Sequence, residues 1–67
     1  MDLYRLLEDG TRIIAHEKNE GLAVRGAKEF NELCDRIDDY GKLEPRLSRC
    51  IAVITGEGEV IKQILEI

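Results

Sequence analysis

The chain has 67 residues, 43% hydrophobic and 36% charged, and its ten basic and fourteen acidic side chains give a net charge of −4. This balance excludes a disordered chain and predicts one small domain over residues 1–67, because so short a chain can build only one core. The acidic charge opposes binding to nucleic acid, and no apolar run approaches the roughly 18 residues of a membrane span, so we expect a cytoplasmic protein without membrane contact.

Residues 3–16 are predicted to form a β-hairpin. Asp9-Gly10 lies between two apolar runs and is a strong signal for a two-residue type I′ turn. Such a turn would set Leu6 opposite Ile13 on the face of the hairpin that packs against the rest of the protein.

An amphipathic helix is predicted in the centre of the chain, from the residue after Asn19 to Gly41. Asn19 is a suitable N-cap residue, and Gly41 followed by Pro45 is a stop signal. Apolar residues recur between them at spacings of three and four, which places them on one stripe of a helix. They are Leu22, Ala23, Gly26, Ala27, Phe30, Leu33, Cys34, Ile37 and Tyr40.

The segment after the helix predicts a second hairpin. A β-branched run ends at Gly56, and a second apolar run begins at Val60. A turn centred on Glu57-Gly58 would set Ile54 against Ile61.

Together these elements predict an α+β fold, in which two β-hairpins flank one central helix (ββαββ) and the helix packs on one face of an antiparallel sheet. The flanking segments also fit helical spacing, so an all-α three-helix bundle is the alternative. The bundle would place Gly10, Gly56 and Gly58 inside helices, each costing about 1 kcal/mol relative to alanine, which favours the hairpins. In the ββαββ arrangement the helix would cover Tyr4, Leu6, Ile13, Cys50, Ile54, Ile61 and Leu65.

No group of residues points to catalysis, and we predict no catalytic residue, no cofactor and no metal site. His16 is the only histidine, and Glu17 beside it would point away from it on a strand or a helix, so His16 is expected at the surface. Cys34 and Cys50 lack the CxxC spacing of zinc and redox sites, so both are expected to be buried thiols.

The apolar residues of the predicted sheet exceed what one helix can cover, which indicates an interaction surface on the opposite face. We therefore expect a small non-catalytic protein-interaction module, an inhibitor, adaptor or regulator, that binds a protein partner or a second copy of itself as a homodimer. The alternative is a nucleic-acid-binding transcriptional regulator. The expected interface is Leu3, Leu7, Ile14, Leu47, Ile51, Val53, Val60 and Ile64, with polar contacts from Arg5, Arg12 and Arg49, the last opposite Glu66.

Overall fold

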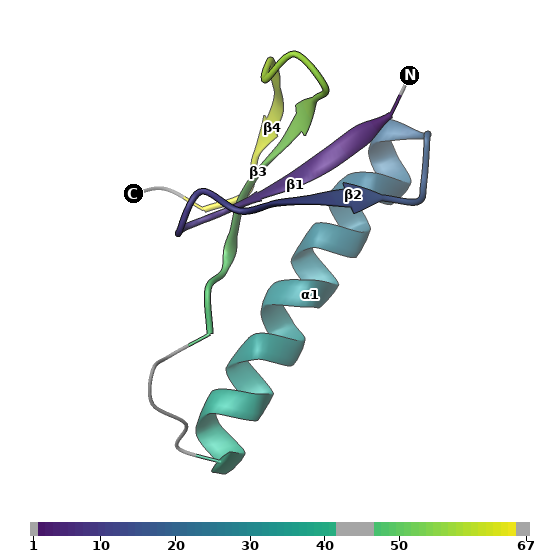
Figure 1. Ribbon diagram of the computed structural model, residues 1–67. Coiled ribbons are helices and arrows are strands. Elements are labelled where there is room, and N and C mark those ends of the chain that lie inside the picture. Colours follow the sequence, from purple (N-terminus) through teal and green to yellow (C-terminus); the bar gives the residue numbers. More distant parts are fainter. Residues whose placement is uncertain (1, 42–46, 66–67) are drawn as a thin grey trace.

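The computed structural model describes residues 2–41 and 47–65, which form one β-hairpin on each side of one long helix in the sequence (Figure 1). The strands pair antiparallel throughout in the order β2-β1-β3-β4, so β1 and β3 lie at the centre of the sheet. The predicted ββαββ fold is confirmed, and the three-helix alternative is wrong. The elements are β1 (Leu3–Leu7), β2 (Arg12–Ala15), α1 (Glu20–Gly41), β3 (Cys50–Thr55) and β4 (Val60–Gln63).

The helix α1 begins where its capping residue predicts. The Asn19 side-chain oxygen Oδ1 accepts a hydrogen bond from the N–H of Leu22 at 3.1 Å, which satisfies one of the free donors of the first turn. Ala23 and Ala27 are fully buried, and their small side chains allow α1 to lie close to the sheet. The core cluster consists of Leu3, Leu7, Ala15, Ala23, Ala27, Cys50 and Val53.

Both hairpins close with a three-residue loop, so the predicted two-residue turns are wrong. In the first hairpin the N–H of Leu7 donates to the carbonyl of Thr11 at 2.9 Å, and the N–H of Gly10 donates to the carbonyl of Leu7 at 3.0 Å. Gly10 has a φ of 88°, and Gly58 has a φ of 89° in the same place of the second hairpin. A type I turn followed by a left-handed glycine is the usual form of a three-residue hairpin loop, and it ends in a bulge.

The longer loop shifts the register of the first hairpin by one residue. Leu6 pairs with Arg12 and not with Ile13, while Leu3 pairs with Ala15. A one-residue shift changes which side chains share a face of the sheet. Leu3 and Ala15 are accordingly both buried in the core against α1, at 2% and 4% exposure.

The second hairpin differs from the prediction only next to its turn, because further along Val53 pairs with Lys62 and Ala52 with Gln63, as a turn centred on Glu57-Gly58 predicts. Ile54 pairs with Val60 and not with Ile61, and a bulge separates this pair from the next one, which includes Val53. Val53 is fully buried in the core cluster. Ile54, the next residue of the strand, points to the opposite face of the sheet and is also buried, at 1% exposure. The Tyr4 ring reaches the turn between β3 and β4. The face of the sheet away from α1 is therefore less open than the sequence predicts.

Candidate functional site

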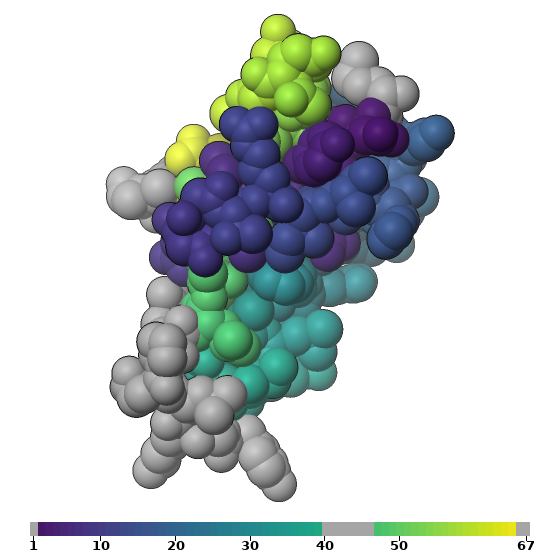
Figure 2. All heavy atoms as spheres, in the orientation of Figure 1, coloured from purple at the N-terminus to yellow at the C-terminus, as the bar shows by residue number. Residues whose placement is uncertain are grey.

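The helix α1 is longer than the sheet it covers. Its 22 residues extend about 33 Å, whereas the six residues of β3, the longest strand, extend about 20 Å. Figures 1 and 2 show the C-terminal half of α1 (teal) projecting beyond the strands, beside the chain that leads into β3 (green). Any apolar surface in this half of the helix must be covered by something other than the sheet.

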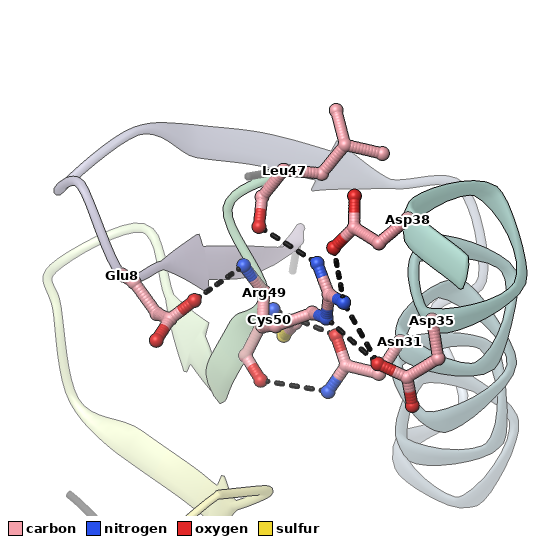
Figure 3. Close-up of polar contacts among 7 residues, drawn as sticks. All are labelled: Glu8, Asn31, Asp35, Asp38, Leu47, Arg49 and Cys50. Atoms are coloured by element: carbon pink, nitrogen blue, oxygen red, sulfur yellow. Dashed lines mark hydrogen bonds and ion pairs between the residues drawn. The ribbon is translucent and has the colours of Figure 1, made fainter. Parts of the chain in front are cut away.

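The start of β3 is fixed to α1 by Asn31, which is 8% exposed. Its side-chain Nδ2 donates to the carbonyl of Cys50 at 2.9 Å, and its Oδ1 accepts from the N–H of Cys50 at 2.8 Å (Figure 3). The ladder between β3 and β4 begins only at Ala52, so the amide of Asn31 takes the place of a neighbouring strand at Cys50. Both backbone groups of a fully buried residue are thereby satisfied.

Arg49 adds a charged contact directly before this point. Its guanidinium donates from Nη2 to Asp38 at 2.6 Å and to Asp35 at 2.8 Å, and from Nη1 to the carbonyl of Leu47 at 2.7 Å (Figure 3). The backbone N–H of Arg49 donates to Glu8 Oε1 at 2.8 Å, which links the loop after β1 to the same segment. Burial lowers the pKa of Arg49, but the hydrogen bonds and charges of Asp38 and Asp35 outweigh it, so the net shift is upward and the side chain stays charged.

These contacts hold the segment 47–49 at a distance from α1 that leaves an apolar groove of about 340 Å³. Among the described residues that line it, Ser48 is the only polar one, and its hydroxyl accepts a hydrogen bond from the N–H of Asp9 at 3.1 Å. On the helix side, Leu33 is 54% exposed and Ile37 is 46% exposed. We call this feature the helix groove, and it is lined by Leu7, Phe30, Leu33, Cys34, Ile37, Leu47 and Ser48.

The N-terminal half of the same side of α1 is closed by Arg5. Its guanidinium carbon lies 5.9 Å from the centre of the Phe30 ring, and its Nη2 lies 4.0 Å from Glu17 Oε2. A Cβ on Gly26 would lie only 2.8 Å from this Nη2, so the glycine makes room for the arginine. Arg5 thus covers α1 up to Phe30, and the apolar surface opens only beyond it.

The residues predicted as an interface do not form one surface. Leu3, Leu7 and Val53 are core residues, at 2%, 7% and 0% exposure, because α1 covers their face of the sheet and not the predicted face of Tyr4 and Leu6. Ile14 and Val60 are exposed, at 43% and 62%, but they lie on the two edge strands β2 and β4, separated by the width of the sheet. Leu47, Ile51 and Ile64 are half-buried.

The predicted polar contacts also separate. Arg12 is exposed and reaches toward the turn at Gly58, whereas Arg5 is half-buried against α1, on the opposite face. Arg49 is buried, and its partners are Asp35 and Asp38; Glu66, its expected partner, lies outside the described residues. The placement of these arginines on a common open face of the sheet was therefore wrong.

The helical spacing of Leu33 and Ile37 predicts that both lie in the core. The sequence does contain a signal that corrects this assignment. A helix of 22 residues cannot be covered along its whole length by strands of four to six residues. Leu33 and Ile37, in the C-terminal half of the stripe, are left about half exposed, as is Leu22 in the first turn of the helix.

The expected thiols and histidine lie as predicted, because Cys34 and Cys50 are free and buried and His16 is exposed. Within residues 2–41 and 47–65 there is no group of three His, Cys, Asp or Glu side chains that could hold a metal ion, and no helix long and apolar enough to cross a membrane. Comparisons with protein-family models, with curated proteins and with solved structures found no match for this chain.

Proposed function

We propose that the protein is a non-catalytic protein-interaction module that acts as a homodimer, and that the helix groove is its binding surface. The observation that carries this proposal is the exposure of Leu33 and Ile37 beside a groove with an apolar lining. Completing the burial of either side chain would contribute about 1 kcal/mol, half of the value for a fully buried aliphatic residue. Exposed aliphatic residues grouped around a concave apolar surface mark an interaction site more often than scattered ones do.

The chemistry of the groove favours binding over catalysis. The Ser48 hydroxyl is already hydrogen-bonded to Asp9, and His16 is exposed in the loop after β2. A groove without a nucleophile and base in contact offers a partner shape and apolar area, and little else. Such a module works as an inhibitor, adaptor or regulator, and two buried free thiols suit a reducing compartment such as the cytoplasm.

Nucleic-acid binding has less support and stays a prediction. Arg5 and Arg49 form ion pairs with carboxylates, and their guanidinium groups are therefore partly neutralised. Arg12 would be left as the main cation of the predicted set, on a protein of net charge −4.

Sedimentation equilibrium tests the proposal. The wild-type chain would be measured from about 1 μM to about 1 mM, a range that spans binding free energies of about −8 to −4 kcal/mol. We expect a monomer–dimer equilibrium that Leu33→Asp abolishes, because the variant places a charge in the groove. The matched control is Val60→Asp, at a residue of similar exposure on β4, and it should leave the equilibrium unchanged. A wild-type chain that stays monomeric throughout would refute the proposal.

A further inference from the structure

We propose that two copies of the chain pair through α1 in antiparallel orientation, with Phe30 of one copy against Leu33 of the other. This inference rests on the proposed function and adds to it the orientation and the register of the dimer. It begins from the spacing of the residues along α1. Ala23, Gly26, Phe30, Leu33, Ile37 and Tyr40 follow one another at steps of three, four, three, four and three, which is the seam of two packed helices.

The sheet covers Ala23 at the start of this seam and the residues beside the seam, and it leaves Leu33 and Ile37 open. Ala27 and Cys34 lie one position further round the helix and are buried, at 0% and 5% exposure. Leu33 and Ile37, within the seam, are about half exposed. A second helix can therefore approach the open part of the seam, at Leu33 and Ile37, while the sheet stays in place.

Charges on the open flank of the seam select the orientation. Glu29 and Arg36 lie seven residues apart on this flank, both are exposed, and neither forms an ion pair with another residue in the described part of the chain. When two antiparallel helices place Phe30 opposite Leu33, the two-fold axis also places Glu29 of each copy opposite Arg36 of the other. Two equivalent attractive pairs then border the apolar contact.

A parallel pair would lose this complementarity. It would bring Glu29 toward Cys34 of the other copy, on the flank that its own sheet already covers. In the antiparallel register Ile37 lies opposite Gly26, where Arg5 covers the helix, so the apolar contact is centred on Phe30 and Leu33. The charges therefore favour the antiparallel arrangement.

Charge reversal tests the register. Glu29→Arg and Arg36→Glu should each weaken the homodimer about tenfold, equivalent to about 1.4 kcal/mol, because each variant brings like charges together at both symmetric positions. When the two variants are mixed in equal amounts, a heterodimer can form in which both symmetric charge pairs are attractive again. Native mass spectrometry, which separates the three dimers by mass, should show the heterodimer well above the statistical half.

A control pair separates this effect from general attraction between oppositely charged chains. Glu32→Arg and Lys28→Glu change the net charge by the same amounts, at exposed positions of α1 away from the seam, and their mixture should give the statistical distribution. A dimeric wild-type chain whose Glu29 and Arg36 variants mix no differently from the controls would overturn the antiparallel register and leave the homodimer standing. A monomeric wild-type chain would overturn both.

Discussion

Replacing Asn31 with alanine should destabilise the fold by about 3 kcal/mol. The change removes two hydrogen bonds to the backbone of Cys50, of 2.9 and 2.8 Å, and leaves a buried N–H and a buried carbonyl without their partner. Each unsatisfied backbone group costs about 1–3 kcal/mol, and the space vacated by the side chain admits some water, so we take the lower half of that range. A domain of this size has a free energy of unfolding of roughly 3–10 kcal/mol, so the loss is a large fraction of the total.

Urea denaturation followed by circular dichroism measures this loss. With a slope of about 1 kcal/mol per molar urea for a small domain, the midpoint should fall by about 3 M. Glu32→Ala, at the exposed neighbouring position, is the matched control and should shift the free energy of unfolding by no more than about 0.5 kcal/mol. If Asn31→Ala behaves like this control, the amide does not replace a neighbouring strand at Cys50, and our account of how β3 is held to α1 fails.

Asn31→Asp gives a second readout through its pH dependence. A protonated carboxyl can still donate to the carbonyl of Cys50, whereas a carboxylate would repel it, so the pKa of the introduced carboxyl group should be raised in the folded state. The variant should therefore be closest to wild type below the unfolded-state pKa of about 3.9 and should lose stability relative to wild type as the pH rises through the folded-state pKa. A constant difference from wild type at all pH values would contradict the proposed geometry.

Further predictions concern the loops and the buried groups. Gly10→Ala should cost about 1–2 kcal/mol by thermal denaturation, because φ is 88° there, while Gly56→Ala in the second loop should be nearly neutral. The hydrogen bonds from Thr11 lower the pKa of Asp9, so the stability that Asp9 contributes is present above about pH 4 and is lost as the pH falls. Asp9→Asn should flatten this part of the stability–pH curve, and an unchanged curve would argue against this role of Asp9. Arg49→Met should destabilise by about 3 kcal/mol in urea, because it removes the charge-assisted hydrogen bonds that the buried guanidinium donates to Asp38 and Asp35; an effect below about 1 kcal/mol would mean that water replaces Arg49 there. Burial raises the pKa of the Cys50 thiol, so a thiol reagent should modify it only at the rate of unfolding, and fast modification of the native protein would show that β3 opens locally.

Several features of this protein follow from local sequence alone. Asn19 caps α1 and Gly41 ends it as predicted, because a cap and a stop signal act within one turn of the helix. The positions of both hairpin loops follow from Gly10 and Gly58, since the left-handed backbone at these residues favours glycine. The ββαββ order was predictable from these signals and from the pattern of apolar residues between them.

The tertiary structure decided what local signals leave open. Whether a glycine closes a two-residue or a three-residue loop depends on which register buries more apolar area across the whole sheet. The tertiary structure also decided which face of the sheet α1 covers, and Leu3 and Val53 lie on that face, in the core. Arg49 pairs with Asp35 and Asp38 because the start of β3 lies against α1, a contact between residues far apart in the sequence. The helix groove has the same origin, because the periodicity of α1 predicts an apolar stripe, but the length of the sheet determines how much of that stripe stays exposed.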